Sequence, residues 1–121
     1  MPEQTVKCLS IRQPWAHLIM SGKKIVEFRS WSTDYRGPLL IHAAQKFVSG
    51  TDYEHLRGSV AHGVILGTVD LYDCKPSWYS VTGEFYWKLR NPRRFAHPIP
   101  YRGQQHLFNV PCNLLPKSFR P

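Results

Sequence analysis

The residues best suited to chemistry stand together on a short segment whose pattern is otherwise typical of a β-strand. Residues 25–31 read IVEFRSW, and Lys24 stands directly before them. Because successive side chains of a strand point to opposite faces, Glu27, Arg29 and Trp31 are predicted to share one face. Glu27 offers an acceptor or a general base, Arg29 a cation and Trp31 a surface on which a base can stack.

The other face of this segment is predicted to pack in the core, because it carries Val26 and Phe28. Strict alternation would also place Lys24 on that face, so a site shared with Glu27 requires a turn or bulge at the strand entry, for which Gly22 is suited. The alternative is a solvated face with an ion pair that contributes under ~1 kcal/mol.

A second group of candidate residues opens the preceding helix, which is expected from Pro14 to the cap at Gly22. Arg12, Gln13 and Trp15 lie at its beginning, where free backbone N–H groups favour an anion. Trp15 offers another stacking surface. Packing of this ring against the core is the alternative.

Composition limits the class of protein. The 121 residues suit one domain over residues 1–121, and the formal charge of +8 favours an anionic partner, with RNA or single-stranded nucleic acid first. A basic protein that merely stays soluble is the alternative. Three widely spaced cysteines favour a reducing cytoplasm, and no stretch is apolar enough for a signal peptide or a membrane span.

Short strands separated by turns predict an α+β fold of five to six strands with two or three helices, arranged as a curved sheet or a small barrel. A bend or bulge is expected at Gly67 and the end of a strand at Pro92. The expected strands are 6–11, 25–31, 39–44, 63–74, 85–91 and 106–110, with one or two helices in 47–63 and an irregular segment over 93–105.

Further candidates lie outside the charged strand. His42 stands in an apolar strand, where a hydrogen-bonded core histidine is the alternative to a catalytic role. Trp87 could extend a cleft floor or pack inside, and Arg93 with Arg94 could follow phosphates or simply be solvated. No histidine or cysteine spacing is typical of a metal site, so we expect no metal and no cofactor.

Several segments together resemble the ASCH domain of the PUA-like superfamily. They are CLSIRQPWAHLIMSGKKIVEFRSW, YRGPLLIHAA, GVILGTVDLYDC and FYWKLRNPRRFAHPIPYRG. The most specific element is G-x-K-x-x-E-x-R, formed here by Gly22, Lys24, Glu27 and Arg29. The resemblance runs over about residues 6–110 and implies a small PUA-like β-barrel flanked by helices, with a cleft beside this element.

The resemblance also implies a function, because related PUA-like domains bind RNA and some hold a modified base. The leading hypothesis is therefore an RNA- or nucleotide-binding domain. Its cleft is expected to be lined by Arg12, Gln13, Trp15, Lys24, Glu27, Arg29, Trp31, His42, Trp87, Arg93 and Arg94.

Two other functions stay open. The ASCH family that this chain resembles includes proteins that hydrolyse N4-acetylcytidine or cleave RNA. If this chain had either activity, Lys24 and Glu27 would be the catalytic residues. Glu27 stands where that resemblance expects a threonine, so a hydroxyl nucleophile is missing. The third hypothesis is a protein-interaction module of a transcription or translation complex.

Overall fold

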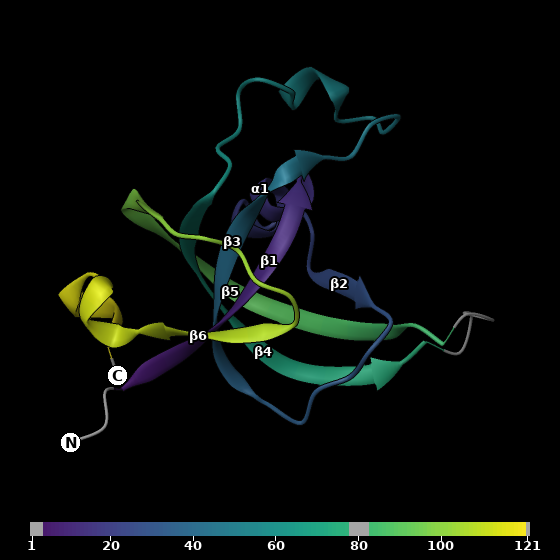
Figure 1. Ribbon diagram of the computed structural model, residues 1–121. Helices are drawn as coiled ribbons and strands as arrows, with labels where there is room; N and C mark the ends of the chain where they lie inside the picture. The colour runs from purple at the N-terminus through teal and green to yellow at the C-terminus, as the bar shows by residue number, and fades with distance from the viewer. Residues whose placement is uncertain (1–3, 78–82, 121) are drawn as a thin grey trace.

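A computed structural model describes residues 4–77 and 83–120 of the chain (Figure 1). The strands are β1 Thr5–Gln13, β2 Val26–Arg29, β3 Gly37–Phe47, β4 Val64–Pro76, β5 Phe85–Pro100 and β6 Leu107–Pro111. The α-helix is α1 Trp15–Met20, and the 3-10 helices are η1 Glu54–Leu56, η2 Cys112–Leu114 and η3 Lys117–Phe119. The α+β class and the expected number of strands are confirmed.

All six strands form one sheet in the order β2-β5-β4-β3-β1-β6. The β1–β3 pair is parallel, whereas the other neighbours are antiparallel. In Figure 1, β1 and β3 run toward α1, while β4 and β5 sweep across to β2. The sheet does not close into the expected barrel, because among the described residues β2 pairs only with β5 and β6 only with β1.

Two segments differ from the sequence-based prediction for local reasons. Residues 47–63, where one or two helices were expected, contain the end of β3 and only the short helix η1. Glycines at 50, 58 and 63 adopt positive φ angles of 77°, 85° and 69°, which a helix does not accept. β5 continues past Pro92, whose position coincides with a shift in register against β4 next to Asn91, at φ 55°. Proline is tolerated within a sheet at such a bulge.

The core occupies both faces of the sheet. One cluster packs α1 against the sheet and includes Ile19, Ile41 and Trp87, while the other includes Leu40 and Phe108. The two faces follow from the alternation of the central strands, whose odd and even residues are both apolar.

The expected irregularity at Gly67 is confirmed, because the register of β4 shifts between Ile65 and Gly67 against β5. A Cβ atom at this glycine would lie 2.2 Å from the carbonyl oxygen of Arg93. The absence of a side chain therefore lets β4 and β5 approach closely at the bend.

The connection from α1 to β2 is a compact turn. Gly22 has a φ of 79° and donates its N–H to the carbonyl of Ile19, and the N–H groups of Lys23 and Lys24 both donate to Leu18. This arrangement ends the helix and fixes the direction in which Lys24 leaves the turn.

Candidate ligand-binding cleft

The centre of the candidate site is a carboxylate held between two cations. Glu27 is only 7% exposed, and its Oε1 lies 3.5 Å from the Nζ of Lys24. Its Oε2 accepts hydrogen bonds from Nη2 and Nε of Arg29, at 2.9 and 3.1 Å. Burial of this charge is tolerable because both oxygens have cationic partners.

Lys24 reaches Glu27 because it precedes β2 and belongs to the turn after α1. Strand alternation therefore does not separate the two side chains. The turn at the strand entry that a shared site requires is present. The Nζ of Lys24 also lies 5.5 Å from the centre of the Trp15 ring and 5.3 Å from that of Phe28. Two aromatic rings thus flank the cation in cation–π contacts.

The predicted faces of β2 are wrong. Phe28, expected in the core, is 48% exposed, and Val26 is half-buried, whereas Glu27 is buried. The reason is a tertiary contact: Nη2 of Arg29 donates to the carbonyl of Ser10 on β1 at 2.9 Å, which turns the charged face inward. Hydrophobicity alone could not reveal this orientation.

The ion-paired residues open into a cleft of about 920 Å³, here called the Glu27 cleft. Its lining carries three side-chain cations and one carboxylate, so its formal charge is positive. Arg12 is exposed and makes no side-chain hydrogen bond or ion pair with the described residues. The lining residues are Ser10, Arg12, Trp15, Lys24, Glu27, Phe28, Arg29, Ser30, Trp31, Ala44, Val48, Gln104, Gln105 and His106.

Trp31 and Trp87 have different roles. Trp31 is half-buried, lines the cleft and makes edge contacts with Trp87 and His106, at ring distances of 4.7 and 4.8 Å. Trp87 is fully buried, and its Nε1–H donates to the carbonyl of Trp31 at 3.1 Å. Of the two interpretations of Trp87, packing inside the protein is therefore the one that the structure shows. The buried Trp87 ring packs against Trp31, which lines the cleft.

Gln13 and His42 are buried polar residues with complete internal partners. The amide of Gln13 donates to Ala61 and accepts from the N–H of His17, both at 2.8 Å. His42 lies 2.7 Å from the carbonyl of Tyr101 through Nε2. Neither residue lines the Glu27 cleft, but His42 lines an adjoining hollow under the loop 101–105, which shares Ser10, Ala44, Gln104 and Gln105 with the cleft.

Arg93 and Arg94 lie on β5, away from the Glu27 cleft. Arg93 stacks on the ring of Phe119, while Arg94 contacts Nδ1 of His17 at 3.2 Å. Neither lines the cleft. A ligand in the cleft would therefore meet these arginines only if it extended across the surface.

Sequence analysis missed several lining residues. Phe28 was assigned to the core, and Gln104, Gln105 and His106 come from the loop before β6, which reaches the cleft only through the fold. The polar run QQH after a proline-rich segment was the one available signal. Polarity in a loop is too common to identify a site.

Ser10 and His42 form a buried polar pair, in which the Oγ of Ser10 lies 2.9 Å from Nδ1 of His42. Since Tyr101 offers only a carbonyl acceptor, Nε2 carries the proton and Nδ1 accepts from the serine hydroxyl. Burial lowers the pKa of His42, which keeps it neutral. Gly103 closes over this pair, since a Cβ there would lie 2.8 Å from the imidazole.

Three other kinds of site or segment were considered: an anion site at α1, a metal site and a membrane-spanning helix. α1 has six residues, so the anion site expected at its N-terminus has little helix behind it. Within residues 4–77 and 83–120, no three histidine, cysteine or acidic side chains lie together as metal ligands. In the same part of the chain, no helix has the length and apolar character needed to cross a bilayer.

The α+β fold is similar to that of known solved structures. The ASCH protein of Zymomonas mobilis has a TM-score of 0.63 at 15% identity, over 89% of both chains. A single-residue variant of the same protein has a TM-score of 0.64 at 15% identity, covering 92% of this chain and 94% of that one.

The sequence comparisons then identify the family. The ASCH domain model matches residues 9–110, so this chain belongs to the ASCH domain family. Human activating signal cointegrator 1 is 33% identical over 127 residues, covering 85% of this chain. The mouse protein of that name is 32% identical, also over 85%. The chain spans 22% of the length of these two relatives.

Proposed function

We propose that this chain binds RNA and holds a single unpaired base in the Glu27 cleft. The observation that carries the proposal is the buried carboxylate between Lys24 and Arg29, at 3.5 and 2.9 Å, beside the exposed ring of Phe28 and the half-buried ring of Trp31. Membership of a family implicated in RNA binding supports the anionic ligand that the positive charge favours.

The cleft offers the contacts that an unpaired base and its phosphate require. Trp31 and Phe28 provide flat surfaces, on which stacking contributes about 1–3 kcal/mol per base. Glu27 has lone pairs beyond those its cations occupy, so it can accept an N–H from the base edge. Arg12, without another partner among the described residues, would take a phosphate.

Hydrolysis of an acylated cytidine is the second candidate function, supported by the approach of Lys24 to Glu27. Glu27 would act as a general base on water, and Lys24 would stabilise the charge that develops. The described lining contains no other carboxylate, and the hydroxyl expected from the family resemblance is replaced by Glu27 itself. Binding without turnover is therefore the function that we favour.

Binding is tested with fluorescently labelled single-stranded RNA and a matched pair of variants. Lys24→Ala should weaken RNA binding about tenfold, because it removes a cation from the cleft. Lys23→Ala removes the same charge from an exposed neighbour that does not line the cleft, and should change affinity less than about twofold. Equal losses in the two variants would contradict the assignment of the cleft.

The same proteins separate the remaining functions. Incubation with N4-acetylcytidine should give no cytidine above background, and hydrolysis that disappears in Lys24→Ala would establish the enzyme instead. A salt titration separates RNA binding from a protein-interaction module. RNA affinity should fall steeply between about 50 and 200 mM salt, whereas an apolar interface responds little.

A further inference from the structure

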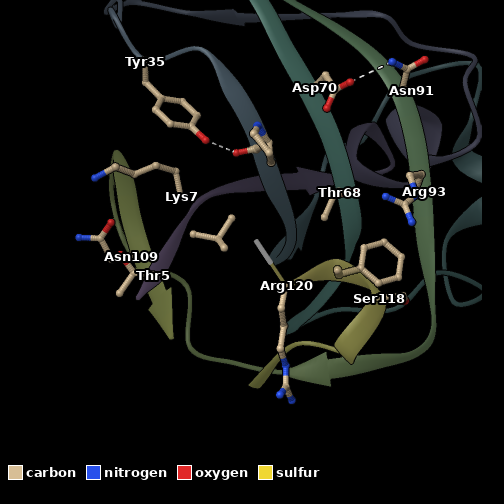
Figure 2. A pocket seen from close by; sticks show the side chains of 13 residues that line it. Thr5, Lys7, Tyr35, Thr68, Asp70, Asn91, Arg93, Asn109, Ser118 and Arg120 are labelled. Carbon is tan, nitrogen blue, oxygen red and sulfur yellow. Dashed lines mark hydrogen bonds between the residues drawn. The ribbon is translucent and has the colours of Figure 1, made fainter. Parts of the chain in front are cut away.

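A second cavity, here called the C-terminal pocket, lies where β1, β4 and β5 meet the end of the chain (Figure 2). Its volume is about 760 Å³, within the range of small-molecule sites. It shares no lining residue with the Glu27 cleft. Side chains from β1, β4, β5 and the C-terminal segment surround it, among them Lys7, Thr68, Asp70, Arg93, Phe119 and Arg120.

Arg93 is the cation best placed for a ligand in this pocket. Its guanidinium lies over the ring of Phe119 at 4.5 Å, and that ring is held in turn by Phe95 at a ring distance of 4.6 Å. None of the guanidinium N–H groups of Arg93 has a hydrogen-bond or ion-pair partner among the described residues. One face of this planar guanidinium packs on an aromatic ring, and its N–H donors are unused. Such a group can donate two parallel hydrogen bonds to a phosphate.

The other cations of the pocket reinforce its charge without occupying its centre. Arg120 donates to the carbonyls of Leu115 and Asn113, at 2.9 and 3.2 Å, and Figure 2 shows its side chain turned away from Thr68. Lys7 lines the same pocket. With Arg93, the lining carries three cations and one carboxylate, so its formal charge is positive and favours anions.

The carboxylate gives the pocket a second recognition element. Oδ2 of Asp70 accepts from the amide of Asn91 at 2.9 Å, while its Oδ1 has no partner among the described residues (Figure 2). Tyr35 donates its hydroxyl to the carbonyl of Pro38, so that hydroxyl is already used. Asp70 therefore remains free to accept from a ligand hydroxyl or amine.

We propose that the C-terminal pocket binds a nucleoside phosphate, with the phosphate on Arg93 and ribose hydroxyls or a base amine on Asp70. Val6, Pro38 and Phe119 supply the apolar surface that a base needs. The phosphate can belong to a free mononucleotide or to the terminal nucleotide of an RNA strand, since both present the same group. This site is additional to the Glu27 cleft and does not depend on it.

Backbone and side-chain NMR spectra of the whole chain, titrated with AMP, GMP, CMP and UMP, test the proposal. A nucleotide should shift the signals of Thr68, Asn109 and Ser118, which line the pocket on three separate elements. The corresponding nucleoside without phosphate should bind about tenfold more weakly, because it lacks the charge-assisted hydrogen bonds. Shifts confined to residues 24–31 would overturn the proposal, as would inorganic phosphate binding as tightly as the nucleotide.

Two arginines that are neighbours in sequence provide matched variants. Arg93→Ala should weaken nucleotide binding about tenfold or more, whereas Arg94→Ala, which removes an equal charge outside the pocket, should stay within about twofold. Arg93→Lys keeps the charge over Phe119 but loses the fork, and should bind with intermediate affinity. Equal losses in the two alanine variants at unchanged melting temperature would overturn the proposal.

The source of the phosphate is decided by competition. Displacement of a mononucleotide by a 5′-phosphorylated RNA oligomer, and not by its dephosphorylated form, would assign the pocket to an RNA terminus. Failure of both oligomers would assign it to free nucleotides. Nucleotide-induced shifts of Thr68, Asn109 and Ser118 report this pocket, whereas shifts within residues 24–31 report the Glu27 cleft, so failure of the Glu27 cleft as an RNA site is distinguishable from failure of this pocket.

Discussion

The Glu27 cleft and the C-terminal pocket each contain three side-chain cations and one carboxylate, but the charges are arranged differently. In the cleft, Lys24 and Arg29 converge on a buried carboxylate. In the pocket, Arg93 has no acidic partner among the described residues, and Asp70 bonds an amide instead. The two sites therefore have the same formal charge but differ in whether their cations are paired with a carboxylate.

The difference predicts how each site responds to a ligand. Charges that already neutralise one another are fixed in position before binding, so they select a ligand by hydrogen-bond geometry. An unpaired cation instead exchanges its counterion for the ligand, which makes binding sensitive to salt. The following variants test this contrast, in order of decreasing expected effect.

Glu27→Gln should have the largest effect, because it leaves Lys24 and Arg29 facing each other without their shared carboxylate. The free energy of unfolding should fall by about 2–3 kcal/mol and RNA affinity at least about tenfold. Urea denaturation and RNA titration measure the two losses. Glu54→Gln breaks the exposed pair with Arg57, at 2.8 Å, and should leave both quantities unchanged.

Trp31→Ala should lower stability as well as affinity, because the ring packs on Trp87 and also lines the cleft. We expect a loss of about 1–2 kcal/mol in unfolding free energy, less than for a fully buried tryptophan. Affinity for a nucleoside should fall by a similar free energy. Thermal melting and nucleoside titration check this, and unchanged nucleoside affinity would place Trp31 with the core alone.

Arg12→Ala should change the salt dependence of RNA binding more than Lys24→Ala does. Arg12 is unpaired within the described residues and would release one counterion on meeting a phosphate of single-stranded RNA, so its loss should lower the slope by about 0.7. Lys24 is already neutralised by Glu27. RNA titrations at several salt concentrations measure both slopes, and identical slopes would remove the distinction between paired and unpaired cations.

The smallest effect concerns pH. Burial lowers the pKa of His42 below its ordinary value, so below about pH 6.5 the unfolded chain takes up a proton that the folded chain resists. Stability should be fully present above that pH and decline as the pH falls. The pKa of His17 is also lowered, chiefly by burial and by Arg94, and acts in the same direction.

Melting temperatures at a series of pH values measure this decline. His42→Gln should reduce the acid-side slope, and His17→Gln serves as the comparison for the second histidine. A slope that neither variant changes would exclude both histidines as its source. The absolute melting temperature is not the readout, because removal of the hydrogen bonds of His42 to Ser10 and Tyr101 lowers it at every pH.

Local sequence patterns predicted the strands well, because alternation and β-branched residues act within a strand. They failed for residues 47–63, where glycines at positive φ break a helical spacing. They also failed at Pro92, because a bulge that depends on the partner strand accommodates the proline. Both errors arise from backbone geometry that hydrophobicity does not encode.

The candidate cleft was only partly predictable for a similar reason. The motif residues Lys24, Glu27 and Arg29 do come together, as the family resemblance suggested, although strict alternation would have placed Lys24 on the other face. The orientation of β2 was predicted wrongly, because a carboxylate can be buried once two cations compensate it. The contribution of residues 104–106 depends on a loop that is distant in sequence.

The hydrogen bond from Arg29 to the Ser10 carbonyl has a mechanical consequence. β6 pairs with β1 only from Thr5 to Leu9, so Ser10 lies just past the end of that pairing, and the guanidinium bridges β1 and β2 across the open side of the sheet. A barrel would be closed there by a ladder of backbone bonds. Here the side chain of Arg29 spans the opening, and the same side chain holds Glu27. Within residues 4–77 and 83–120, this hydrogen bond is the only cross-link that we find between β1 and β2. A ligand that draws Glu27 away would therefore loosen it. Ligand binding in the cleft and the width of the sheet opening would then change together.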